Sequence, residues 1–231
     1  MIPIRDDQPR FSTPYLTYFL IALNLLIFFF ESQLDSRSIR SLFYHLGLVP
    51  SHVTGVLAGH NSFDPVAVFL PFITSMFLHG GWAHVIGNMW FLWIFGDNIE
   101  DYLGHFKYIV FYLLSGIFAA VAQLMLTPHS TAPTVGASGA IAGVLGAYFI
   151  LYPRARVLTW LFIFVFYVPA WAMLGYWFVL QFLSGAASST VDAGQTGAGV
   201  AFWAHVGGFI AGIVLIKIFP ERAQRRRYAT W

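Results

Sequence analysis

Long apolar stretches separated by short polar segments dominate this chain. A helix needs about 20 consecutive apolar residues to cross the hydrocarbon core of a bilayer. Stretches of this kind cover residues 14–30, 83–102, 108–126, 138–152, 157–183 and 199–219. The pattern therefore predicts an all-α membrane protein, built as a bundle of six transmembrane helices.

A shorter apolar run at residues 66–78 lies within a long first loop, residues 31–82. The run contains Pro71, which interrupts a regular helix. Loop backbone cannot face lipid directly, because its N–H and C=O groups would lack hydrogen-bond partners. We expect the run to be a re-entrant or interfacial element and the loop to be a packed, membrane-embedded part of the protein.

Composition also favours a membrane protein. Hydrophobic residues make up 58% of the 231 residues and charged residues only 10%, whereas soluble domains carry about 25% charged residues. The chain has no cysteine, which excludes disulfides and thiol catalysis. We expect a single membrane domain over residues 1–231, without a removable signal peptide, that contacts the lipid bilayer and no nucleic acid.

The basic residues predict the orientation of the six spans, because Lys and Arg gather on the cytoplasmic side. With both termini in the cytoplasm, ten of the twelve basic residues fall on that side, and only Arg37 and Arg40 fall outside. The cytoplasmic set consists of Arg5, Arg10, Lys107, Arg154, Arg156, Lys217, Arg222, Arg225, Arg226 and Arg227. The last four of these lie in the tail at residues 220–231. A compact six-helix chain with no transit peptide is, by analogy, expected in a bacterial plasma membrane.

Polar side chains within the predicted spans are functional candidates, because they are costly to place in lipid. Ser138 and His205 each lie 15 residues before the proline that ends their span. At 1.5 Å per residue both are about 22 Å above the inner boundary, or roughly 8 Å below the outer surface of the core. Asn88 reaches the same level on the second span, with His84 one turn away on the same face. The three spans therefore bring polar groups to one plane.

Small residues predict which helices approach closely. In the sixth span Gly208 and Gly212 form a GxxxG pair, and they follow His205 at i+3 and i+7. Such spacing lets helix backbones pack tightly. The fourth span carries Gly139, Gly143 and Gly146. We predict that the fourth and sixth helices pack together with Ser138 and His205 at their contact.

This arrangement favours nucleophilic catalysis. A serine hydroxyl is a weak nucleophile until a neighbouring base takes its proton, and neutral His205 can take that proton from Ser138 and return it to a leaving amine. The carboxylates of the second span lie about three turns deeper, at Asp97, Glu100 and Asp101. The sequence therefore predicts a Ser–His dyad without an orienting carboxylate.

The tetrahedral oxyanion formed in such a reaction needs positioned hydrogen-bond donors. The side chains of Asn88 and His84 can supply them, and so can the backbone N–H of Ser138 at the start of its helix. Gly136 and Gly139 allow the chain to bend tightly beside the nucleophile.

These motifs resemble those of the rhomboid intramembrane serine proteases. Residues 79–88 match the family's HxxxxHxxxN, residues 96–100 its GxxxE, residues 136–139 its GxSG and residues 204–205 its AH. The resemblance covers roughly residues 70–219, with the motifs in the family's order.

Several roles follow from the resemblance. It implies a serine endopeptidase in which Ser138 is the nucleophile and His205 the base. It further implies an oxyanion site formed by His84, Asn88 and the backbone at Ala137 and Ser138. His79 and Glu100 are implied to hold the first loop and the second helix. The implied substrates are membrane proteins whose transmembrane helices unwind easily, and no metal or other cofactor is implied.

The chain departs from the family pattern at two places. Some members carry a tyrosine four residues after the serine, stacked on the catalytic histidine, where this chain has Ala142. A Trp-Arg pair common in the family's first loop is also missing, and Leu70-Pro71-Phe72 occupies that region. Both departures concern how the histidine and the first loop are held.

Other interpretations stay open at this point. An intramembrane Ser often bonds to its own helix backbone, and Asn88 with His84 can simply join helices. Haem ligation by His79, His84 or His205 would leave Ser138 unexplained. A non-catalytic rhomboid relative that binds membrane clients would be expected to lack the serine or the histidine. A transporter is less favoured, because no inverted repeat is visible.

Access to a buried serine calls for a gate. The fifth span is rich in aromatic residues, including Trp177 and Phe178, which would suit a side door facing lipid. An ordinary lipid-exposed helix is the alternative. The small, polar loop at residues 184–197 suits a mobile cap over the site.

Overall fold

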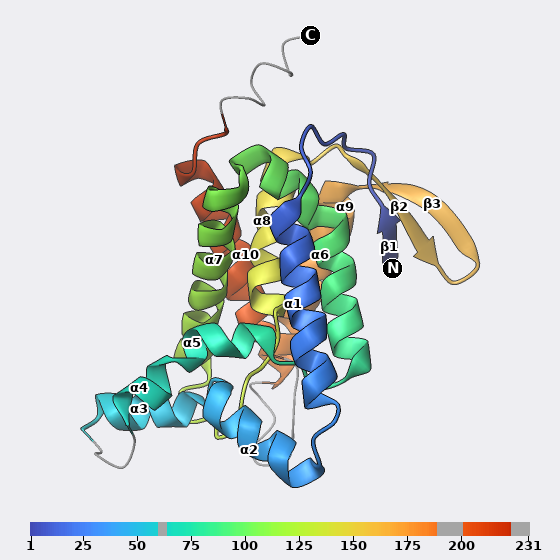
Figure 1. Cartoon of the computed structure of the whole chain (residues 1–231). Coiled ribbons are helices and arrows are strands. Elements are labelled where there is room, and N and C mark those ends of the chain that lie inside the picture. Colours follow the sequence, from blue (N-terminus) through green and yellow to red (C-terminus); the bar gives the residue numbers. More distant parts are fainter. Residues whose placement is uncertain (60–63, 189–200, 223–231) are drawn as a thin grey trace.

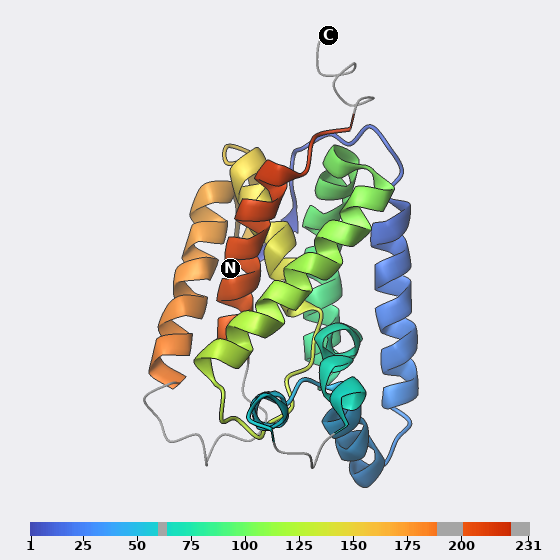
Figure 2. The same ribbon diagram turned by 90° about the vertical axis from the view of Figure 1, so that its left-hand side faces the viewer.

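The computed structural model describes residues 1–59, 64–188 and 201–222, and these residues are mostly helical. The long helices form an upright bundle in which α8 packs against α6, α7, α9 and α10 (Figures 1 and 2). The bundle helices are α1 (Tyr15–Glu31), α6 (Trp82–Leu103), α7 (His105–Leu126), α8 (Ser138–Leu151), α9 (Ala170–Ser188) and α10 (Phe202–Ile218). For five of the six predicted stretches, the helix boundaries agree with the prediction to within three residues.

Membrane-spanning character is clearest for two of these helices. In the described part of the chain, α7 and α9 are long and apolar enough to cross a bilayer. A third span results if Pro65–Phe77 and α6, which meet at a bend of 74°, count as one. The other bundle helices, α1, α8 and α10, are apolar but shorter. The chain is therefore a membrane protein, while length and composition alone do not establish six spans.

The first loop folds into short helices at one end of the bundle (Figure 1). They are α2 (Ser36–Leu46), α3 (Pro50–Leu57), α4 (Pro65–Phe69), α5 (Pro71–Thr74) and the 3₁₀ turn η1 (Ser75–Phe77). The predicted interfacial run at 66–78 thus forms α4, α5 and η1. At the start of α2, the Asp35 carboxylate accepts the N–H groups of Ser38 and Arg37, and these bonds hold the pKa of Asp35 below its usual value.

The fifth predicted span, residues 157–183, is wrong in its first half. Residues there form a hairpin of β2 (Arg156–Leu161) and β3 (Phe164–Pro169), and β1 (Ile2–Arg5) pairs with β2 to complete an antiparallel sheet in the order β1-β2-β3. The all-α fold class is wrong to this extent. The physical reason is that a run of β-branched and aromatic residues favours strands while having the same hydrophobicity as a transmembrane helix.

Glycines bring α8 and α10 into backbone contact. A Cβ atom on Gly208 would overlap the carbonyl oxygen of Gly139, and one on Gly212 would overlap that of Gly143. The predicted tight packing of the fourth and sixth helices is therefore confirmed. This contact matters for the site because Ser138 begins α8 and His205 lies in the first turn of α10.

Replacement of Gly212 by alanine should destabilise the protein, because the added methyl group has no space beside Gly143. Overpacking of this kind costs on the order of 2 kcal/mol, which for a chain of this size corresponds to a melting temperature lower by roughly 4–8 °C. Thermal unfolding in detergent measures the shift. Gly87→Ala on α6 is the matched control, because a Cβ there meets no atom within 4 Å. Equal melting temperatures for the two variants would contradict the packing argument.

The opposite end of the bundle from the first loop is held by polar contacts. Glu100, near the end of α6, accepts the N–H groups of Leu16 (2.9 Å) and Thr17 (2.7 Å), so its carboxylate caps the first turn of α1. His105 Nδ1 lies 2.6 Å from the same carboxylate. Asp97 faces Arg10 at 3.5 Å. These carboxylates thus bind groups remote from Ser138.

Candidate active site

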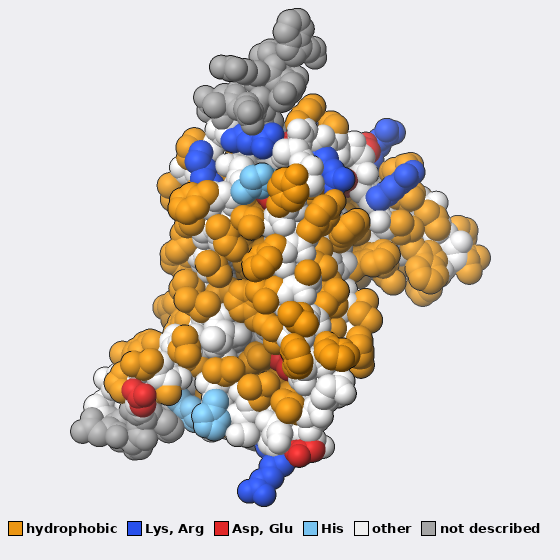
Figure 3. Space-filling model, viewed as in Figure 1, with side chains coloured by type: hydrophobic (Ala, Val, Ile, Leu, Met, Phe, Trp, Pro, Cys, Tyr) orange, Lys and Arg blue, Asp and Glu red, His pale blue; other side chains and the backbone are white. Residues whose placement is uncertain are grey.

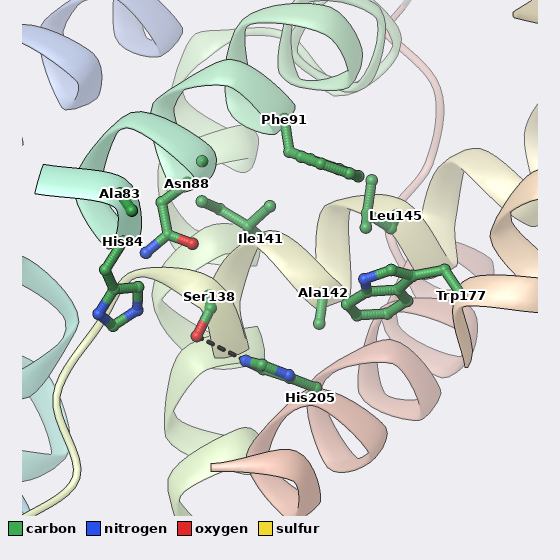
Figure 4. A pocket seen from close by; sticks show the side chains of 11 residues that line it. Ala83, His84, Asn88, Phe91, Ser138, Ile141, Ala142, Leu145, Trp177 and His205 are labelled. Atoms are coloured by element: carbon green, nitrogen blue, oxygen red, sulfur yellow. Dashed lines mark hydrogen bonds between the residues drawn. The ribbon is translucent and has the colours of Figure 1, made fainter. Parts of the chain in front are cut away.

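A cavity of about 220 Å³ lies between α6, α8, α9 and α10 (Figure 4). The three helices predicted to carry the site, α6, α8 and α10, contribute to it, and so does α9. Its lining consists of Ala83, His84, Gly87, Asn88, Phe91, Ser138, Ile141, Ala142, Leu145, Trp177 and His205. Four polar side chains from three helices therefore meet in an otherwise apolar cavity.

The loop before Ser138 has a conformation that requires glycine. Gly136 has φ +130°, and a Cβ at this position would crowd the imidazole of His84. The N–H of Gly136 donates to the carbonyl oxygen of Ser75 at 2.8 Å, which anchors the loop to η1. The first loop of the chain thus supports the turn that presents Ser138 as the first residue of α8.

Ser138 and His205 are brought together across the contact of α8 and α10. The serine Oγ lies 2.7 Å from His205 Nε2, as the dashed line in Figure 4 marks. The His205 side chain is largely buried, at 8% exposure. In the tautomer with a free lone pair on Nε2, the serine hydroxyl donates to the imidazole, which is the geometry that proton removal from a serine requires.

Gln181 is a site neighbour that the sequence analysis missed. Its Oε1 lies 2.7 Å from His205 Nδ1. Gln181 is the only amide or charged side chain in α9, and this was the available signal. The misassigned start of the fifth helix concealed it, because the depth of a residue is counted from the helix boundary.

Trp177 of α9 lies against the histidine ring. Its ring centroid is 5.8 Å from that of His205, with an interplanar angle of 35°. Ala142 leaves room on this side, and Trp177 provides the aromatic contact that the sequence lacks at position 142 (Figure 4). Phe178 packs on Phe209 at 4.8 Å. Both α9 aromatics are half-buried against α10, and Trp177 lines the cavity, so the role of this helix as a side door stays a prediction.

The predicted cap at residues 184–197 is described only in part. Residues 184–188 continue α9 to Ser188 rather than beginning a loop. Residues 189–197 lie outside the described residues.

Asn88 and His84 flank the serine from α6 (Figure 4). Asn88 is 8% exposed, and within the described structure its Nδ2 has no hydrogen-bond partner. A buried amide donor without a partner is costly, which favours a role toward a bound group. His84 Nδ1 accepts the N–H of Gly80 at 3.4 Å, so that the ring proton is on Nε2, the nitrogen nearer Gly136.

His79 lies behind His84. The two rings meet edge to face at 5.2 Å, and the backbone N–H of His79 donates to Glu31 Oε2 at 3.1 Å. His79 thus links the end of α1 to the ring of His84, while it does not line the cavity. Its expected structural role, like that of Glu100, stays a prediction.

Comparison with known proteins identifies the family. The Rhomboid domain model matches residues 67–222, more than half of the chain. The chain belongs to the rhomboid family. It is 30% identical over 174 residues to Rhomboid protein 1, mitochondrial, of Saccharomyces cerevisiae (72% of this chain, 47% of that protein), and 26% identical over 209 residues to Rhomboid-like protein 11, chloroplastic, of Arabidopsis thaliana (88% and 65%). It is also 33% identical over 135 residues to Rhomboid protease GluP of Bacillus subtilis (58% and 24%).

The relatives qualify two expectations. This rhomboid chain spans between a quarter and two thirds of the length of these curated proteins. Their names place two of them in mitochondria or chloroplasts. The comparisons therefore do not support a bacterial plasma membrane as the location of this chain.

Proposed function

We propose that this rhomboid chain is an intramembrane serine endopeptidase in which Ser138 is the nucleophile and His205 the general base. The observation that carries the proposal is the 2.7 Å approach of Ser138 Oγ to His205 Nε2 inside a cavity that also holds Asn88, whose Nδ2 has no partner among the described residues. A structural serine on an apolar helix would be satisfied by its own helix. Here the hydroxyl meets a base and a donor from two other helices.

The chemistry follows from these positions. His205 Nε2 takes the Ser138 proton as Oγ bonds to the carbonyl carbon of the scissile peptide, and negative charge develops on the carbonyl oxygen. Nδ2–H of Asn88, Nε2–H of His84 and the backbone N–H of Ser138 act as donors to that oxygen. The C–N bond then breaks, and His205 returns the proton to the leaving amine. Water deacylates the serine ester by the same base.

The proposed membrane arrangement has six spans with both termini on one side. On the face shown in Figure 3, Lys and Arg gather at the end of the bundle where the described chain leaves α10, and few lie at the opposite end. This distribution supports a cytoplasmic location for that end. The helix α8 has 14 residues, so it is only about 21 Å long. A helix shorter than the hydrocarbon core supports a serine that lies below the membrane surface, with the membrane-embedded first loop at its side.

The proposed substrates are transmembrane segments of membrane proteins. A peptide bond inside a stable helix is shielded by its own hydrogen bonds, so the cleaved segment must be one that unwinds easily. The four polar side chains in the cavity are all assigned to the reaction itself, and the remaining lining is apolar. This lining suits the apolar side chains of such a segment.

Reconstitution with a membrane substrate tests the proposal. The purified protein should cleave a tagged single-span protein with glycine in its transmembrane segment when both are in one set of vesicles. The products are detected by mass spectrometry, which also locates the cut. A matched substrate with leucine in place of the glycine residues should be cut more slowly. Absence of cleavage across a panel of such substrates would contradict the proposed activity.

The haem-binding alternative is disfavoured by the contacts of His205. Its two ring nitrogens face Ser138 and Gln181 at 2.7 Å each, which leaves no lone pair directed at an iron. A non-catalytic family member is disfavoured by the presence of both Ser138 and His205 in contact.

Activity should fall as the pH is lowered. The neutral imidazole of His205 is the working form, because an imidazolium cannot accept the serine proton. The other ionisable side chain in the cavity, His84, still donates a hydrogen bond when protonated. The acid limb of kcat/KM should therefore show one ionisation. A second ionisation that disappears in Glu100→Gln would contradict a dyad that works without a carboxylate.

A further inference from the structure

The imidazole of His205 is held by residues of two different helices. Nε2 faces Ser138 on α8, and Nδ1 lies 2.7 Å from Gln181 Oε1 on α9. Four residues before Gln181, Trp177 packs against the same ring. Residues at i and i+4 lie on one face of a helix, so one face of α9 contacts the histidine twice.

The contact at Nδ1 decides which nitrogen of His205 carries the proton. A neutral imidazole has one N–H, and the other nitrogen is an acceptor. Nε2 can accept from Ser138 only if the proton is on Nδ1, and an N–H buried there needs an acceptor. The amide oxygen of Gln181 is that acceptor. In the opposite tautomer Nε2–H would donate to Ser138 Oγ and could not take its proton.

We propose that Gln181 is a positioning residue for the general base. Its amide oxygen holds His205 in the tautomer that is protonated on Nδ1, and the ring of Trp177 fixes the plane of the imidazole. This inference rests on the proposed peptidase function and adds a third member to the predicted dyad. Gln181 acts through His205, because it does not line the cavity that holds Ser138.

The neutral acceptor sets the size of the effect. A hydrogen bond between neutral groups contributes less than a carboxylate bond, and its loss is expected to lower kcat on the order of tenfold. Loss of the buried Asp in a soluble triad costs about 10⁴-fold. Glu at position 181 keeps an acceptor oxygen in either protonation state, so Gln181→Glu should retain at least the original kcat.

Two substitutions at position 181 separate hydrogen bonding from packing. Gln181→Met has nearly the same volume and no amide oxygen, and it should lower kcat about tenfold with little change in KM. Gln181→Glu should preserve kcat. Leu183→Met is the control, because Leu183 is 57% exposed on the same helix. Equal losses in the Met and Glu variants, or a change confined to KM, would overturn the proposal.

Nitrogen NMR reports the tautomer independently of activity. In ¹⁵N-histidine-labelled protein, the His205 signals are assigned by comparison with His205→Gln. The original protein should show a protonated Nδ1 and an unprotonated Nε2, and Gln181→Met should shift the signals toward a mixture of tautomers. Unchanged signals in Gln181→Met would overturn the proposal. Failure of the proposed function is distinguishable, because the original protein would then not cleave any substrate while its tautomer was still measurable.

A second, independent observation concerns the tip of the hairpin β2–β3. Phe162, Ile163 and Phe164 are 83%, 86% and 64% exposed. Figure 3 shows apolar side chains extending from the bundle along this hairpin, just below basic side chains at the same end. The chain carries no charged residue from 157 to 183. At the base of the hairpin, the guanidinium of Arg156 lies over the ring of Tyr167 at 5.4 Å.

The bilayer interface is the partner that fits this tip. The apolar surface continues from the bundle, which is itself in lipid, and aromatic residues are enriched at headgroup level. In the part of the chain that the structure describes, the outer edge of β3 has backbone groups without strand partners, and these cannot enter the hydrocarbon core. We infer that the tip inserts among phospholipid headgroups and the adjoining acyl chains, with Arg156 toward the phosphates.

The absence of cysteine makes this test direct. A nitroxide label at Ile163→Cys, in vesicles of phosphatidylcholine with some phosphatidylglycerol, should be accessible to oxygen and poorly accessible to a water-soluble nickel complex. Phe118→Cys on the exposed face of α7 and His129→Cys after α7 provide the lipid and water references. Nickel accessibility equal to that of His129→Cys would overturn the inference. Spin–spin broadening between tips would also overturn it, by assigning the tip to a second copy of the chain.

Discussion

Ser138→Ala is expected to abolish peptide cleavage, and His205→Ala is expected to do the same. Each variant removes one side of the 2.7 Å contact between Oγ and Nε2, and proton transfer then has no donor or no acceptor. In a soluble serine protease, loss of the serine or the histidine lowers kcat on the order of 10⁶-fold. Cleavage of a single-span substrate in vesicles measures the effect.

Ser138 and His205 should also act as one catalytic unit. The double variant Ser138→Ala/His205→Ala should be no less active than either single variant, because the removed groups work in one step. Ser41→Ala and His129→Ala, at exposed positions outside the cavity, control for the loss of a serine or a histidine as such. Cleavage by Ser138→Ala above the rate without protein would contradict the assignment of the nucleophile.

Asn88→Ala should give the second largest loss. The amide Nδ2 is buried beside Ser138 without a partner in the described structure, and a donor to the oxyanion acts mainly in the transition state. Loss of one such donor costs on the order of 10²-fold in kcat. Because His84 and the backbone of Ser138 remain as donors, the loss can be smaller than this. In either case kcat should fall by a larger factor than KM rises.

The same helix offers a matched control. Asn98 is buried at 2% exposure ten residues further along α6, and its Oδ1 has no partner in the described structure. Asn98→Ala should alter stability without a comparable change in kcat, since it is far from Ser138 along the helix. If Asn88→Ala changed only KM, Asn88 would be a residue that joins helices rather than an oxyanion donor.

Much of the site could be predicted because helix geometry converts sequence distance into depth. Ser138 and His205 lie equally far from the prolines that end their helices, and Gly208 and Gly212 identify the face on which α10 meets α8. In the structure, Ser138 and His205 meet at this contact, as the residue spacing predicts. The prediction succeeds because both helices are regular from the site to the boundary from which depth is measured.

The parts that could not be predicted lie in α9 and the hairpin before it. Aromatic and β-branched residues at 157–169 are as apolar as a transmembrane helix, and the pairing of β2 with Ile2–Arg5 is a contact between segments far apart in the sequence. The depths of Trp177 and Gln181 in the membrane could not be estimated from the sequence, because depth is counted from the end of a helix and the true start of α9 is Ala170. Their contacts with His205 follow from tertiary packing.

Labelling with a fluorophosphonate tests the central claim most directly, because this reagent reacts with a serine only when a base activates it. Mass spectrometry of the labelled, detergent-solubilised protein should locate one phosphonyl adduct on Ser138. The adduct should be absent from Ser138→Ala and from His205→Ala, and it should be retained in Ser41→Ala. Absence of any adduct, or an adduct at another residue that persists in Ser138→Ala, would contradict the account.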